Sequence, residues 1–121
     1  MEPVDGLYLG TERGGRWWRR YTAPGFLARG NGRMWSDVRG LWFHKLLSRS
    51  PLHIPWERIE SIDVTAWHAG RWAWGLPIVR VAWRESGEAL ASGFLVGSRR
   101  QDGEAALQRV RSEWSERSRA A

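Results

Sequence analysis

The stretch that decides the fold is Gly32–Val64, GRMWSDVRGLWFHKLLSRSPLHIPWERIESIDV. Its middle, Leu41–Leu47, alternates in such a way that Leu41, Phe43 and Lys45 share one face of an extended segment. An alternation with a period of two is typical of a half-buried β-strand. The segment before it ends in a tight turn at residues 37–40, so the two extended segments are expected to form a hairpin.

Two prolines divide the second half of this stretch. Pro51 and Pro55 bracket the β-prone residues Leu52–Ile54. Because proline cannot donate a hydrogen bond to a neighbouring strand, this spacing predicts a short strand at the edge of a sheet. Residues 56–60 then predict a single turn, and residues 61–66 predict a further strand.

The C-terminal third predicts a hairpin followed by a helix. Pro77–Arg84 and Leu90–Val96 are extended segments joined by the polar residues 85–88, and Gly93 predicts a bulge or the close approach of a neighbouring element. The apolar spacing then changes from 2 to 3.6. Leu107, Val110 and Trp114 form one apolar stripe, and Asp102 is the expected N-cap. Together they predict a helix over about 103–116, with fraying at 118–121.

The N-terminal part gives weaker signals. Asp5–Gly10 predicts a short strand and Trp17–Thr22 is β-prone. Phe26–Arg29 begins another extended segment, which Gly30-Asn31-Gly32 is expected to break.

Length and composition favour a single globular domain over residues 1–121. The chain is 42% hydrophobic and 26% charged, and it contains no cysteine, which excludes disulfides and thiolate metal sites. No apolar run approaches the length that spans a membrane. The expected location is the cytoplasm, either free or peripheral at the inner face of the membrane.

Positive charge is concentrated near the N-terminus. The net charge is +6, and residues 13–49 contain nine cationic residues but only Asp37 as an acid. A basic group of this kind attracts polyanions, although an ordinary solvated face is the competing interpretation. The candidate binding residues in it are Arg16, Arg19, Arg20, Arg29, Arg33 and Arg39.

A second candidate surface is the loop 67–75, WHAGRWAWG. Its tryptophans and arginine are Trp67, Arg71, Trp72 and Trp74. Such a loop suits a membrane interface, a protein hot spot or a base-stacking platform. The alternative is that Trp67 and Trp72 fold back over the sheet as part of the core.

No catalytic pattern is present. The three histidines, His44, His53 and His68, lie in separate elements and lack a metal-binding spacing. The carboxylates of residues 57–63 fit a solvated turn, and neither a nucleophile elbow nor a phosphate-binding loop occurs. We therefore expect no enzyme activity, no metal and no cofactor.

The order of these elements resembles the pleckstrin-homology (PH) superfold, and bacterial PH-like and GRAM-like domains show a similar spacing of apolar residues. The resemblance is carried by the hairpin GRMWSDVRGLWFHKL, the junction Ile54-Pro55-Trp56 with Ile59 and Ile62, the hairpin of residues 77–96, and the helix with Trp114. It covers about Phe26 to Trp114. Residues 1–25 fall outside it, as an extension that adds a strand or closes one end of the barrel.

The resemblance implies a mainly β fold: an antiparallel barrel or split sandwich of about seven strands, capped by one C-terminal α-helix. A plain β-sandwich with a packed helix would give nearly the same pattern. In eukaryotic relatives a basic first hairpin holds a phosphoinositide headgroup. Here Arg29 and Arg33 lie at a similar place, but the family's usual spacing of basic residues is absent. The resemblance therefore implies general attraction to anionic lipid and not recognition of a specific headgroup.

Three functions compete at this stage. The first is a non-enzymatic module that docks on a protein partner or an acidic membrane surface through the two candidate surfaces. The second is a nucleic-acid-binding protein, and the third is a small-ligand-binding barrel. The edge strand at Leu52–Ile54 would also permit a homo-oligomer through strand addition.

Overall fold

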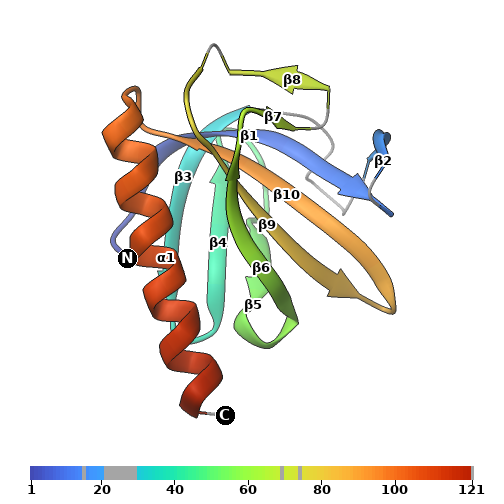
Figure 1. Cartoon of the computed structure of the whole chain (residues 1–121), viewed down its shortest axis with the longest axis vertical. Coiled ribbons are helices and arrows are strands. Elements are labelled where there is room, and N and C mark those ends of the chain that lie inside the picture. Colours follow the sequence, from blue (N-terminus) through green and yellow to red (C-terminus); the bar gives the residue numbers. More distant parts are fainter. Residues whose placement is uncertain (15, 21–29, 69, 74, 121) are drawn as a thin grey trace.

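The structure is a computed structural model that describes residues 1–14, 16–20, 30–68, 70–73 and 75–120, and for residues 16–20, 71, 72 and 120 it describes the backbone alone. A continuous antiparallel sheet curls around the core, in the order β5-β4-β3-β1-β10-β9-β6 (Figure 1). The seven strands of this path are β1 (Val4–Arg13), β3 (Gly30–Asp37), β4 (Gly40–Lys45), β5 (Leu52–Pro55), β6 (Ile59–Thr65), β9 (Ile78–Glu85) and β10 (Glu88–Val96).

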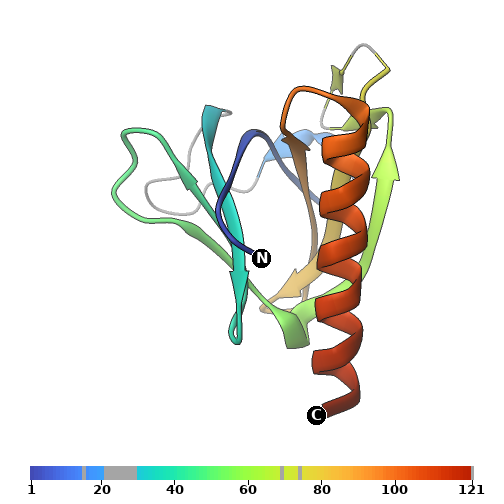
Figure 2. The ribbon, with the colours of Figure 1, turned by 90° about the vertical axis from the view of Figure 1, so that its left-hand side faces the viewer.

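Shorter elements and one helix complete the chain. Strand β2 (Arg16–Arg20) pairs with β1 off the main path, and β7 (Trp67–His68) pairs with β8 (Arg71–Trp72) in a separate hairpin. A single 3-10 turn, η1 (Trp56–Arg58), joins β5 to β6. The helix α1 (Arg100–Ala120) lies along one open side of the curled sheet (Figure 2). The expected mainly β, PH-like architecture with one C-terminal helix is therefore confirmed.

The N-terminal strand is central. β1 pairs with β3 on one side and with β10 on the other, so it joins the two halves of the sheet. Of the two expectations for this part of the chain, the structure has the added strand, and β1 is longer than the expected Asp5–Gly10. The expected break at Gly30-Asn31-Gly32 is wrong, because these residues begin β3 and pair with β1. The expected segment at 26–29 lies outside the described residues.

Other strand expectations hold with shifted ends. β5 occupies an edge of the sheet between its two prolines, as expected. β4 ends at Lys45 and not at Leu47, because the chain turns there and the Ser48 backbone N–H donates to the Lys45 carbonyl at 3.1 Å. The expected loop after β6 contains the β7–β8 hairpin.

The helix is longer than the expected 103–116. Asp102 is not its N-cap but the third helical residue, and its carboxylate accepts hydrogen bonds from the backbone N–H groups of Ser98 and Arg99 at 3.2 and 3.0 Å. An acidic residue at this position reaches back to the amides that the helix leaves unpaired. At the other end, residues 118–120 stay helical, with Arg117 and Arg119 in the last turn, where cations suit the helix dipole.

The core lies between the curled sheet and α1. Tyr8, Phe43 and Phe94 from three strands form a triangle of tilted rings with centroids 5.5–5.9 Å apart. The expected stripe on α1 packs against this cluster: Leu107 and Val110 are buried and Trp114 is half-buried. Burial of this apolar surface is the main force that holds the helix on the sheet.

A β-bulge at Gly10 changes the alternation of β1. The register passes from Tyr8↔Phe94 directly to Gly10↔Gly93, which leaves one extra residue in β1. Side chains three positions apart normally point to opposite faces of a strand. Because of the bulge, Tyr8 and Thr11 both point inward, and their oxygens form a hydrogen bond of 2.6 Å.

This bond begins a buried chain of polar side chains. Thr11 Oγ1 lies 2.7 Å from Ser92 Oγ, and the Trp83 Nε1–H donates to Ser92 Oγ at 3.0 Å. Each of these polar groups thereby has a partner in the interior, where an unpaired group would be costly. The network ties β1, β9 and β10 together at the bulge.

On the other face of the bulge, the His68 ring packs against Gly93. A Cβ on Gly93 would lie 2.3 Å from Cδ2 of His68, and His68 Nε2–H donates to the Gly10 carbonyl at 2.9 Å. This contact anchors the β7–β8 hairpin on the sheet. The expectation of a bulge or close approach at Gly93 is confirmed, since both occur there.

Replacement of Gly93 by alanine tests this packing. Alanine in a strand interior is ordinarily more favourable than glycine by about 0.5–1 kcal/mol, but here its methyl group would overlap the His68 ring. We expect Gly93→Ala to lower the free energy of unfolding by about 1–3 kcal/mol in a denaturant titration. In a His68→Ala background the loss should shrink, because the ring is gone; an equal loss in both backgrounds would contradict this account.

Candidate functional site

The two surfaces expected from the sequence attach to the same segment of β1. β2 pairs with β1 through Glu12↔Arg20 and Arg13↔Arg16, and the β7–β8 hairpin is anchored through His68 on Gly10. The arginine-rich strand and the tryptophan-rich hairpin are therefore held by neighbouring residues, Gly10–Arg13. Arg16, Arg19 and Arg20 lie on β2, Arg71 and Trp72 form β8, and Arg29 and Trp74 lie outside the described residues.

Trp67 is the tryptophan of the hairpin whose side chain the structure describes. It is 51% exposed, so it does not fold back into the core. Its backbone N–H donates to Thr65 Oγ1 at 3.3 Å, and the Thr65 hydroxyl donates to the Trp67 carbonyl at 3.0 Å. The Trp67 indole is thus exposed to solvent, while hydrogen bonds to Thr65 hold the backbone of Trp67.

Arg33 and Arg39 do not join this group. Arg33 lies on the outer face of β3, where its side chain is 70% exposed and forms an ion pair of 3.5 Å with Asp5. Arg39 lies in the β3–β4 turn. In Figures 1 and 2 this turn lies at the lower end of the molecule, near the C-terminal end of α1, whereas the β7–β8 hairpin lies at the upper end. The six arginines therefore do not form one basic face.

Sequence reasoning missed a row of stacked rings on the outer face of β3, β4 and β5. The rings of Trp35 and Trp42 are parallel, with centroids 6.1 Å apart, and His53 stacks on Trp42 at 3.8 Å. Trp35 lies opposite Trp42 in the register, so the alternation of the two strands could have revealed the pair. Each face of the Trp42 ring is occupied by a neighbour, which suits a row that stiffens the sheet.

Hydrogen bonds hold the edges of these rings. Trp42 Nε1–H donates to Asp37 Oδ1 at 2.9 Å, and His53 Nε2–H donates to the Arg39 carbonyl at 3.2 Å. Burial acts to raise the pKa of Asp37, but hydrogen bonds from Trp42, Arg39 and Gly40, together with the charge of His53, outweigh it and lower the pKa below its ordinary value. Asp37 therefore favours its ionised form in the folded protein.

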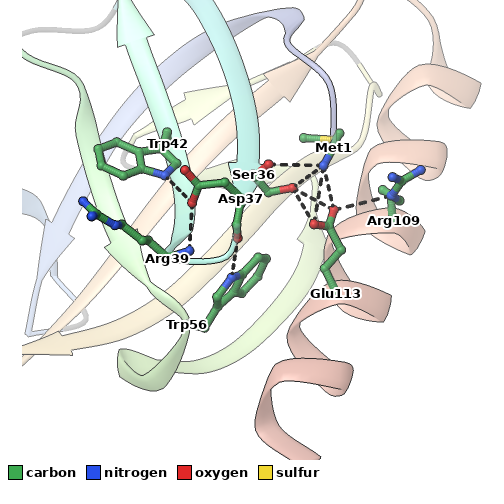
Figure 3. A network of polar contacts seen from close by, with 8 residues as sticks. All are labelled: Met1, Ser36, Asp37, Arg39, Trp42, Trp56, Arg109 and Glu113. Atoms are coloured by element: carbon green, nitrogen blue, oxygen red, sulfur yellow. Dashed lines mark hydrogen bonds and ion pairs between the residues drawn. The ribbon is translucent and has the colours of Figure 1, made fainter. Parts of the chain in front are cut away.

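A second polar cluster ties β3 to α1 (Figure 3). The Ser36 hydroxyl donates to the Glu113 carboxylate at 2.7 Å, and the Met1 amino group donates to Ser36 Oγ at 2.7 Å and lies 3.2 Å from Glu113. Arg109 lies 3.5 Å from Glu113 one turn earlier on the helix. Since these groups satisfy one another, the cluster is a structural tie between sheet and helix.

The described interior is filled, and the hollows are open to the surface. Met34, Val81 and Val110 have no exposed surface inside the curled sheet. An open hollow of about 410 Å³ lies beside Trp35, between the start of the chain and the β4–β5 turn, and it is lined in part by Pro3, Arg33 and Leu46. Within the described part of the chain, no group of three or more His, Cys, Asp or Glu residues is placed to hold a metal ion.

A family model described as bacterial PH domain-like matches residues 1–112. The chain belongs to the bacterial PH domain-like family. The match begins at residue 1, so β1 and β2 are part of the family pattern, which extends the similarity beyond the expected range of 26–114.

Membership of the bacterial PH domain-like family supports a binding module in general, since PH-like domains commonly mediate protein or lipid interactions. No curated protein is significantly similar in sequence to this chain. Among the described residues, none of the helices is long and apolar enough to cross a membrane.

The tie between Ser36 and Glu113 can be tested through stability. Glu113→Ala leaves the partly buried Ser36 hydroxyl without its acceptor, and we expect it to lower the free energy of unfolding by about 1–3 kcal/mol. Glu116→Ala is the matched control, because Glu116 is exposed on the same helix and a surface change of this kind stays within about 0.5 kcal/mol. Equal losses in the two variants would show that the cluster contributes nothing specific.

The lowered pKa of Asp37 predicts a pH dependence. A carboxylate whose pKa is depressed by folding contributes stability that is present above its unfolded-state pKa of about 3.9 and is lost as the pH falls through the folded-state value. We expect Asp37→Asn to melt at a lower temperature than the unmodified protein at neutral pH, with the gap closing in acid. A gap that stays constant from pH 7 to acid would contradict the role of the ionised carboxylate.

Proposed function

We propose that this domain is a non-enzymatic binding module that docks on an anionic membrane surface with the end of the sheet that carries β2 and the β7–β8 hairpin. One observation carries this proposal: both elements are fastened to the Gly10–Arg13 segment of β1. The backbone of the arginine-bearing strand β2 and the hairpin that carries Trp67 are thereby held at neighbouring residues of the same strand.

The residue types suit an anionic lipid surface. Cations near such a surface contribute about 1 kcal/mol each, and tryptophan is enriched at the level of the headgroups, where one edge of the ring is polar and the rest is apolar. Trp67, half-exposed on the hairpin, supports this assignment. The filled interior supports contact at the surface over uptake of a small ligand into the barrel.

Co-sedimentation with vesicles tests the proposal. We expect the protein to bind phosphatidylcholine vesicles that contain phosphatidylserine, to bind pure phosphatidylcholine vesicles weakly, and to lose part of its affinity as salt rises to the physiological range. The double variant Arg16→Glu, Arg20→Glu should lower the affinity for anionic vesicles about tenfold or more, because two attractive charges become repulsive.

A charge-matched control separates a specific site from overall charge. Arg39 and Arg117 lie at the opposite end of the molecule, one in the β3–β4 turn and one in the last turn of α1. The double variant Arg39→Glu, Arg117→Glu changes the net charge by the same amount and should leave most of the vesicle affinity intact. An equal loss in both double variants would contradict docking through the β2 end.

Absence of binding to both kinds of vesicle would overturn the membrane proposal. The same arginines and tryptophans also suit a protein interface or single-stranded nucleic acid. A titration with a labelled single-stranded oligonucleotide at about 50 mM salt distinguishes these two cases, since a nucleic-acid-binding protein would bind tightly there and lose affinity steeply as salt rises.

A further inference from the structure

The β4–β5 turn, Lys45–Arg49, carries two neighbouring leucines in solvent. Leu46 is 67% exposed and Leu47 is fully exposed at 105% of its reference surface. Single exposed apolar residues are ordinary, but two adjacent leucines at the tip of one turn form a small apolar patch that has no partner within the described chain. Figure 2 shows this turn projecting sideways from the body of the molecule, at the left of the view and in its upper half.

The turn is built in a way that fixes the leucines outward. Leu47 has a backbone φ of +66°, a conformation that suits glycine or asparagine and disfavours leucine. The turn closes through Ser48, whose backbone N–H and hydroxyl both donate to the Lys45 carbonyl, at 3.1 and 2.7 Å. His44 Nε2–H donates to the Ser48 carbonyl at 3.0 Å. The leucines are thus held in place by hydrogen bonds and not left on a loose loop.

Positive charge surrounds the tip. Residues 38–56 contain Arg39, Lys45 and Arg49 and no acidic residue. Lys45 and Arg49 flank the two leucines directly, and Arg33, which forms an ion pair with Asp5, lies along the open hollow beside the turn. An apolar tip flanked by cations complements an anionic bilayer, whose headgroups attract the cations while the acyl boundary accepts the leucines.

We propose that the turn Lys45–Arg49 inserts Leu46 and Leu47 into the interfacial layer of an anionic membrane. This inference rests on the proposed docking to anionic membranes and names a second contact for it. In Figures 1 and 2 the β4–β5 turn and the β7–β8 hairpin both lie toward the upper end of the molecule. Both can therefore reach one planar surface. A projecting tip fits a fluid surface better than it fits a protein groove, because the bilayer adapts to the shape of the tip.

An environment-sensitive fluorophore tests insertion directly. The chain has no cysteine, so Leu47→Cys and Val38→Cys each give one labelling site. Val38 is the matched control, because it is 69% exposed in the β3–β4 turn at the opposite end. With vesicles of phosphatidylcholine and phosphatidylserine, we expect the emission of the probe at position 47 to shift to the blue and to intensify, and the probe at position 38 to stay unchanged.

A second variant measures the contribution of the leucine without a probe. Leu47→Asn removes the apolar side chain and suits the left-handed backbone of this position, so the melting temperature should be unchanged or raised. Its affinity for the same vesicles should nevertheless fall about tenfold, as expected from loss of one inserted leucine. The opposite changes in stability and binding distinguish a membrane contact from a structural role.

The outcomes separate the two proposals. If the unmodified protein sediments with anionic vesicles while position 47 reports no change and Leu47→Asn binds normally, the insertion of the turn is wrong and docking through β2 and the hairpin stands. If the unmodified protein does not sediment with anionic vesicles at all, both proposals are overturned. A blue shift at position 38 as large as that at position 47 would also overturn insertion of the turn.

Discussion

The β-bulge at Gly10 is the constraint on which the other features of this domain depend. The extra residue turns Thr11 inward beside Tyr8, which creates the buried polar chain through Ser92 to Trp83. It also leaves the Gly10 carbonyl available to His68, whose ring fits only because Gly93 lacks a side chain. One irregularity in β1 thus fixes the interior of the sheet and the position of the β7–β8 hairpin outside it.

The two ends of the described molecule differ. One end carries β2, the β7–β8 hairpin and the β4–β5 turn, all rich in arginine, tryptophan or exposed leucine. The other end carries the β3–β4 turn and the tie between Ser36 and Glu113, where polar groups satisfy one another. The features that suit a partner are concentrated at the first end.

The β4–β5 turn shows how an energetically unfavourable backbone conformation can point to function. Leucine at a positive φ is unfavourable, and leucine in water gains nothing from the hydrophobic effect, so Leu47 contributes little to folding where it lies. The hydrogen bonds of Ser48 hold this arrangement in place. The proposed membrane contact would give such a residue a role outside the fold, and the flanking cations suit an anionic surface.

Local sequence patterns are enough to predict three elements: the hairpin around residues 37–40, the edge strand between Pro51 and Pro55, and the apolar stripe of the helix. Periodicity and proline act over a few residues, so a short window contains their signal. The sequence also indicated the family through the order of these elements. Three other features follow from the three-dimensional fold: the central place of β1, the stacking of Trp35 on Trp42, and the separation of Arg33 and Arg39 from strand β2. These depend on register and curvature, which bring together residues far apart in the chain and which no short sequence window contains.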